Sequence, residues 1–78
     1  MTTIRYSIKE RAHVSLKIYN VAGQLVKTLV SQVQSPDQVK PVRWDGRNNV
    51  GQPVASGVFF YKMVTKGFSQ TKKMVHLK

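Results

Sequence analysis

The sequence predicts an all-β fold, a small immunoglobulin/fibronectin-III-like antiparallel β-sandwich of six or seven strands. Short segments in which apolar and polar residues alternate recur along the 78 residues, and this period is that of a strand with one buried face. Gly, Asn, Asp and Pro residues separate these segments at a spacing typical of such sandwiches. No segment has a convincing helical period. A small Greek-key barrel is the alternative arrangement.

The first three strands follow from alternation and from one turn signal. In residues 3–9 and in residues 13–19, every second residue is apolar. The apolar side chains of each segment therefore lie on one face of the predicted strand. The turn that follows runs from Asn20 to Gly23. Asn20 can accept hydrogen bonds from nearby backbone amides, and Gly23 tolerates a positive φ. Residues 25–30 are then the hairpin partner.

A proline marks the next strand as peripheral. Residues 31–37 are polar and contain a proline, so we expect a loop. Residues 38–44 are the following strand, and Pro41 lies within it. Proline cannot donate to a ladder, so this strand is expected at a sheet edge or bulged.

The loop at residues 45–57 is the most informative part of the chain. Asp45, Gly46 and Gly57 are its expected structural turn residues, as Asn20 and Gly23 are those of the earlier turn. Asp45 is expected to accept hydrogen bonds from amides of its own turn.

The last two strands complete the pattern. Residues 58–64 begin apolar on both faces, as expected for a central strand. Residues 65–67 are a hairpin turn and residues 68–77 the last strand. A seventh strand arises if residues 52–55 pair briefly.

Alternation also predicts the core. Trp44, the single tryptophan, is expected to pack against the aromatic strand that begins near Phe59. The expected core residues are Ile4, Tyr6, Val14, Leu16, Ile18, Val42, Trp44, Phe59 and Tyr61.

The composition limits the partners and the chemistry that this chain can have. Thirteen Lys and Arg residues against three acidic residues give a net charge of +10. This charge permits contact with polyanions such as lipopolysaccharide. No specific nucleic-acid binding is expected, because the aromatic motif of RNA-binding sheets is missing. Cysteine is absent, so neither a disulfide nor a thiolate is available.

The sequence offers no candidate chemistry. His13 and His76 are the only histidines, and we expect both to be exposed or half-exposed on strands. A zinc site needs three or four converging ligands, and glycosidase chemistry needs two nearby carboxylates. We therefore expect no catalytic residue, no metal site and no cofactor, and we expect that the protein is not an enzyme.

The ordered combination of four segments resembles a known group. The segments are Thr3 to Ile8, Val14 to Val30, Trp44-Asp45-Gly46-Arg47 with Ala55 to Lys62, and Gly67 to Lys78. Together they resemble the type A C-terminal sorting domain of type IX secretion cargo. That domain is similar to the Ig-like domain of the flagellar hook-capping protein. Trp-Asp-Gly-Arg is shared with the hook-capping branch, and the closing Lys-Met-Val-x-Leu-Lys favours the secretion branch.

The chain departs from the sorting-domain pattern at two places. The Asn-Pro-Phe-Asn-Pro segment that often precedes the first strand is absent. His76 stands where that family commonly has an aliphatic residue.

The resemblance implies a non-catalytic sorting module that an outer-membrane translocon reads in the periplasm. Residues 1–78 would be one Ig-like domain at the C-terminus of a larger secreted or cell-surface protein. We expect a monomer whose partners are the translocon and the cargo domain upstream. Partner recognition is expected on the last strand, through Lys72, Lys73, Met74, Val75, Leu77 and Lys78. The alternatives are a structural Ig-like domain of a hook-capping-type or other extracellular protein, and a basic polyanion-binding module.

Overall fold

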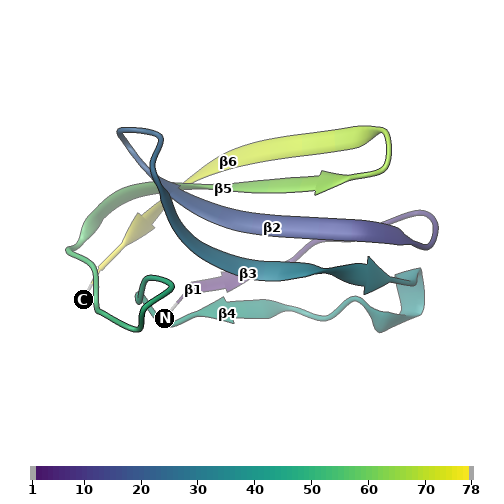
Figure 1. The fold of residues 1–78 in the computed structure, drawn as a ribbon, viewed down its shortest axis with the longest axis horizontal. Helices are drawn as coiled ribbons and strands as arrows, with labels where there is room; N and C mark the ends of the chain where they lie inside the picture. Colours follow the sequence, from purple (N-terminus) through teal and green to yellow (C-terminus); the bar gives the residue numbers. More distant parts are fainter. Residues whose placement is uncertain (1, 78) are drawn as a thin grey trace.

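The computed structural model describes residues 2–77, and within them six strands form two antiparallel sheets (Figure 1). The larger sheet has the order β3-β2-β5-β6, and the smaller sheet pairs β1 with β4. In chain order the strands are β1 (Thr2–Ile4), β2 (Ala12–Asn20), β3 (Leu25–Gln34), β4 (Val42–Trp44), β5 (Gly57–Thr65) and β6 (Phe68–His76).

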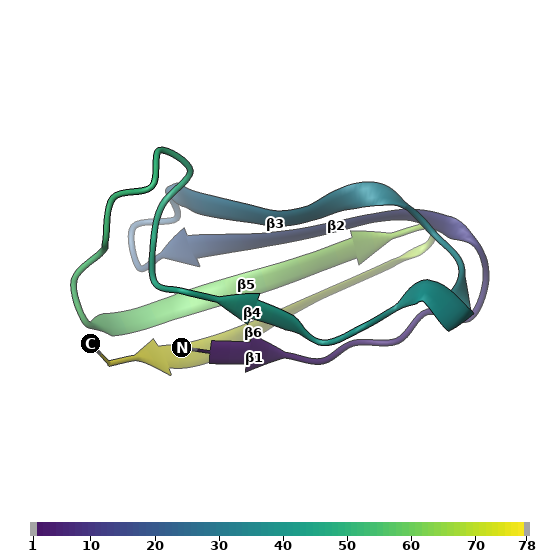
Figure 2. The same cartoon turned by 90° about the horizontal axis from the view of Figure 1, so that it is seen from below.

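The two sheets lie face to face. β1 and β4 lie over one face of the larger sheet, as the view turned by 90° from Figure 1 shows (Figure 2). The predicted antiparallel β-sandwich is therefore confirmed. Residues 52–55 add no seventh strand, because their pairing is limited to an isolated bridge between Arg47 and Pro53.

Between β3 and β4 the chain makes a short 3-10 helix, η1 (Pro36–Gln38). The backbone N–H of Ser35 donates to Oε1 of Gln38 at 2.9 Å and closes this turn. Within residues 2–77, no helical segment has the length and apolar character needed to cross a bilayer.

The core lies between the inner face of the larger sheet and the two short strands. β2 alternates as predicted and contributes Val14, Leu16 and Ile18, which are fully buried. Trp44 of β4 is also fully buried, and its ring packs edge-on against Phe59 with 5.2 Å between centroids. Ile4 of β1, Phe59 and Met63 complete the apolar core, while Tyr6, Val42 and Tyr61 are half-buried against it.

Met63 was not among the expected core residues. It lies directly opposite Leu16 in the β2–β5 register, and it therefore faces inward with Phe59 and Tyr61. The alternation of β5 contained this signal, since Met63 is two residues beyond Tyr61.

The predicted loop at residues 31–37 is wrong for its first four residues. β3 continues to Gln34, and pairs extend as far as Ala12 with Gln34. This end of β3 is polar because it is an edge whose side chains mostly face solvent. Gln34 itself is buried, and its Oε1 accepts a 2.6 Å hydrogen bond from the hydroxyl of Tyr6.

The predicted strands at residues 3–9 and 38–44 are both too long. Pairing between β1 and β4 covers three residues and stops where Ile4 faces Val42. In the same register the next partner of Arg5 would be Pro41, which has no N–H to donate. Arg5 to Ile8 consequently lie outside any strand.

The pair of Tyr6 and Gln34 makes a specific prediction. Tyr6→Phe removes the donor and leaves the buried Gln34 amide oxygen without a partner, so we expect a loss of about 1–3 kcal/mol in unfolding free energy. Replacing both groups, with Tyr6→Phe and Gln34→Leu together, should recover most of that loss. Urea unfolding of the three variants measures this. A double variant no more stable than Tyr6→Phe would contradict the assignment.

Candidate interaction surface

The turn between β2 and β3 is organised by one side chain. Oδ1 of Asn20 accepts from the backbone N–H groups of Ala22 and Gln24, each at 3.0 Å. The N–H of Gly23 donates to the carbonyl of Asn20, and Gly23 has φ of +80°. The turn is therefore an Asx-type turn of the kind the sequence indicates.

The loop from Asp45 to Gly57 is held by a series of similar bonds. Oδ1 of Asp45 accepts from the N–H of Arg47 at 3.1 Å, and the indole N–H of Trp44 donates to the carbonyl of Arg47 at 2.9 Å. Oδ1 of Asn48 then accepts from Val50 and Gln52. The buried Trp44 therefore fixes the start of the loop through its hydrogen bond to Arg47.

The same loop covers one edge of the larger sheet. The N–H of Asn49 donates to the carbonyl of Val26 at 3.1 Å, and Oδ1 of Asn49 accepts from the N–H of Thr28 at 3.0 Å. Both partners lie on β3. Asn49 therefore occupies backbone groups of β3 that would otherwise be free at the sheet edge.

His76 is buried, and the expectation that it is exposed or half-exposed was wrong. Its ring lies 4.8 Å from that of Trp44 and 6.1 Å from that of Phe59, between centroids. It reaches the core because β6 places it opposite Gly57, the first residue of β5. His13 is exposed, with Nε2 lying 3.5 Å from the hydroxyl of Ser31.

The backbone of Gly46 lies directly against the His76 ring. A Cβ atom at Gly46 would be 2.5 Å from Cε1 and 2.6 Å from Nε2 of His76. Gly46 also has φ of +77°. The last inward residue of β6 is therefore fitted to the loop that follows β4.

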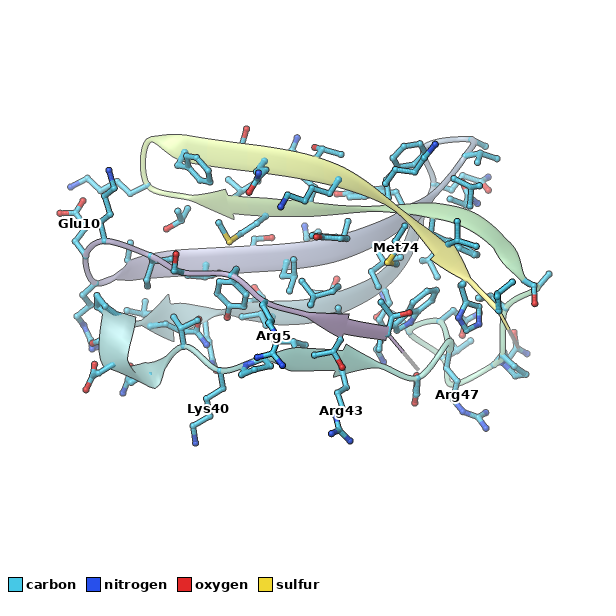
Figure 3. The ribbon with its side chains drawn as sticks, turned by 180° about the vertical axis from the view of Figure 1, so that it is seen from behind. Arg5, Glu10, Lys40, Arg43, Arg47 and Met74 are labelled. Atoms are coloured by element: carbon cyan, nitrogen blue, oxygen red, sulfur yellow. The ribbon has the colours of Figure 1, made fainter. Side chains whose placement is uncertain are left out.

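The structure divides the predicted recognition residues between two faces of β6. Lys72 and Met74 face inward with His76, because they pair with Tyr61 and Phe59. Figure 3 shows Met74 directed toward the interior. Lys73 and Val75 lie on the outer face, and Leu77 follows the end of the strand and is exposed. Lys78 lies outside the described residues.

β6 is an edge strand of the larger sheet. Its backbone pairs with β5 along the whole strand, from Phe68 with Thr65 to His76 with Gly57. No hydrogen bond between described residues joins its other side to a loop, in contrast to the contact of Asn49 with β3. An edge of this kind can accept a further strand by backbone hydrogen bonding.

Basic side chains occur on both outer surfaces of the sandwich. On the outer face of the larger sheet, Lys17 lies opposite Lys62. Lys73 is on the same face, opposite Phe60. On the other surface, exposed basic side chains project along β4 and its flanks (Figure 3). These are Lys40, Arg43 and Arg47. Because these charges are spread over both surfaces, they do not define a single binding site. Those along β4 disfavour the pairing of a further strand with that edge.

The described residues form no cluster of three or more His, Cys, Asp or Glu side chains that could hold a metal ion. The surroundings of Tyr6 change the ionisation of its hydroxyl. Burial raises the pKa of the Tyr6 hydroxyl above its ordinary value. This group belongs to the core contact described above and not to a reactive site.

The two packed antiparallel sheets, with a buried tryptophan between them, define an Ig-like β-sandwich. Residues 1–67 match the model of the FlgD Ig-like domain, and the chain belongs to this family. The match spans β1 to β5 and ends before β6. Comparison with curated proteins and with solved structures gave no match.

The contact of Gly46 with His76 can be tested against a matched turn glycine. A Cβ atom at Gly23 would meet nothing within 4 Å. Gly23→Ala should therefore lose unfolding free energy only through its left-handed backbone, about 1–2 kcal/mol. Gly46→Ala has a similar φ and in addition pushes against a ring fixed by Trp44, which adds about 1–3 kcal/mol. Thermal or urea unfolding compares the two. Equal losses of unfolding free energy in the two variants would show that the His76 ring moves aside without cost.

Proposed function

We propose that the chain is a non-catalytic structural Ig-like module of a hook-capping-type or other extracellular protein. The family match over residues 1–67 carries this proposal. The structure supports it physically, because the loop after β4 is fixed to Trp44, to β3 and to His76. A module held in this way presents its surfaces at defined positions, which an assembly protein requires.

A chimaera tests this proposal. A flagellar hook-capping protein in which residues 2–78 replace the native Ig-like domain should support hook assembly and swimming. The same chimaera with Trp44→Ala should not, since loss of a buried tryptophan costs about 3–5 kcal/mol. Hook length by electron microscopy and swimming on soft agar are the measurements. A stable, exported chimaera that forms no hooks would contradict the proposal for the hook-capping role.

A second function, export address, is favoured by the open edge of β6. Here the domain would be read in the periplasm by an outer-membrane translocon, which would deliver its parent protein to the cell surface or medium. The free backbone of β6 supports this, as strand addition combines main-chain hydrogen bonds with side-chain specificity. Lys73 and Val75 would be read on the outer face, with Lys78 and lipopolysaccharide as further proposed contacts.

The export proposal makes a prediction with a control on the opposite edge. Val75 of β6 and Val33 of β3 are outer-face valines, 58% and 51% exposed. When residues 2–78 follow a periplasm-directed fluorescent protein in a host with a type IX system, Val75→Glu should lower export several-fold. Val33→Glu should leave it unchanged.

Surface fluorescence and the culture medium are compared with a translocon-null strain, with a known sorting domain in parallel. Retention of the unmodified fusion in both strains would contradict the export role. Equal export of the two valine variants would show that β6 is not the surface that is read.

A further inference from the structure

The smaller sheet covers only part of the larger one. β1 and β4 are three residues long, whereas the two central strands of the larger sheet have nine residues each. The first half of β6 therefore lacks a covering layer. Phe68, Gln70 and Lys72 lie on the inner face, in register with Thr65, Met63 and Tyr61, yet all three are exposed.

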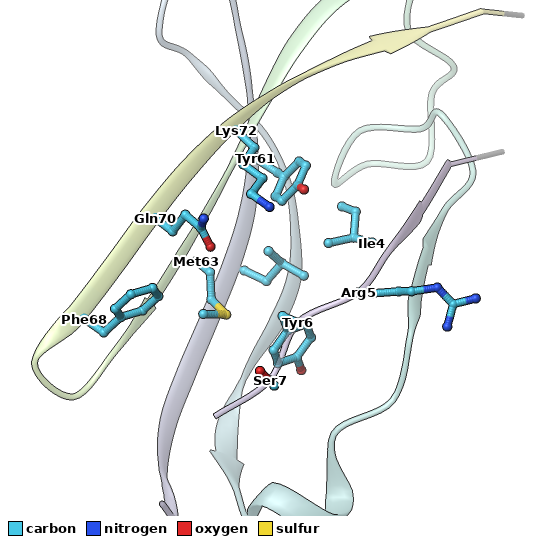
Figure 4. A pocket seen from close by; sticks show the side chains of 10 residues that line it. Ile4, Arg5, Tyr6, Ser7, Tyr61, Met63, Phe68, Gln70 and Lys72 are labelled. Carbon is cyan, nitrogen blue, oxygen red and sulfur yellow. The ribbon is translucent and has the colours of Figure 1, made fainter. Parts of the chain in front are cut away.

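A groove lies between β6 and the N-terminal segment. Figure 4 shows Phe68, Gln70 and Lys72 on one wall and Ile4, Tyr6 and Ser7 on the other. Leu16, Tyr61 and Met63 form its floor, and the hollow has a volume of about 260 Å³. A second hollow of about 580 Å³ continues it toward the turn between β5 and β6 and shares Ser7 and Phe68 with it.

The N-terminal wall has a free backbone. β1 pairs with β4 on one side and with no other strand described in the structure. Arg5 to Ile8 belong to no strand, and none of the backbone hydrogen bonds found between described turn and loop residues involves them. Residues 2–8 would span roughly 23 Å if fully extended, at about 3.3 Å per residue. That is the length of an ordinary strand.

We infer that this groove binds an extended segment of a partner protein, added as a third strand beside β1 and Arg5 to Ile8. Its alternate side chains would lie on the apolar floor formed by Leu16, Tyr61 and Met63, beside Phe68 on the β6 wall. Such an addition would cover the inner face of β6 and complete the smaller sheet.

Charge indicates the chemistry of the segment. Lys72 points into the groove, and Lys9 and Lys66 line its continuation, where Glu10 is the single acidic residue among the described lining residues. The Arg5 side chain points away from β6 (Figure 4). The fitting occupant is therefore a segment in which acidic side chains alternate with apolar ones. A second copy of this chain is disfavoured, because each copy carries a net charge of +10.

This proposal goes beyond the proposed function and does not depend on it, since it concerns the free edge of β1 and not that of β6. The experiment uses the whole chain and a defined probe, the blocked peptide Thr-Val-Glu-Val-Glu-Val-Thr. The same peptide with Lys in place of Glu is its counterpart. Backbone amide shifts and amide hydrogen exchange are measured during titration. We expect shifts and slowed exchange within residues 3–8, and weaker binding of the Lys peptide.

Adjacent lysines provide the matched variants. Lys72→Glu reverses the charge inside the groove and should weaken binding of the Glu peptide about tenfold. Lys73→Glu makes the same change in net charge on the outer face and should leave its affinity unchanged. Because both side chains are exposed, both variants are expected to fold, and their amide spectra check this.

Four results would overturn the inference. These are no binding at millimolar peptide, equal weakening by the two lysine variants, and shifts confined to the outer edges of β3 or β6. The fourth is concentration-dependent shifts of residues 3–8 without peptide, which would show a second copy in the groove.

Discussion

The packing of Trp44 is the interaction on which the rest of this structure depends. Trp44 is the last residue of β4, fully buried, and its ring contacts Phe59 of β5 and His76 of β6. One side chain therefore joins the smaller sheet to two strands of the larger sheet. Its indole N–H also donates to Arg47, so the loop that follows begins from a fixed point. The Asn49 contact with β3 depends on that loop position.

The unequal size of the two sheets explains where the surfaces of interest lie. Four long strands cannot be covered by two strands of three residues, so part of the inner face of β6 meets solvent. The edges are also treated differently. Asn49 occupies part of the β3 edge, and basic side chains line β4, while β1 and β6 each pair on one side only among residues 2–77. Both the export address and the strand-binding groove are proposed at these two open edges.

Burying polar groups inside this small core costs stability unless each of them has a hydrogen-bond partner. Gln34 is matched by Tyr6, so its burial is compensated. His76 is not fully matched, because its Nδ1 is buried and has no hydrogen-bond partner in the part of the chain that the structure describes. An aliphatic side chain would fill the same space without this penalty. His76 is instead accommodated by two aromatic rings and by the absence of a side chain at Gly46.

The sequence by itself determined the all-β class, the succession of six strands along the chain, the alternation of β2 and the two side-chain-closed turns at Asn20 and Asp45. These features depend on neighbours within a few residues, and local pattern therefore carries them. The tertiary structure decided where strands stop and which face is covered. Pro41 ended β1 only because the register placed it opposite Arg5, and β3 ran through a polar segment because β2 pairs with it as far as Gln34. The burial of His76, the Asn49 contact and the groove arise between segments tens of residues apart, and no local period encodes such contacts.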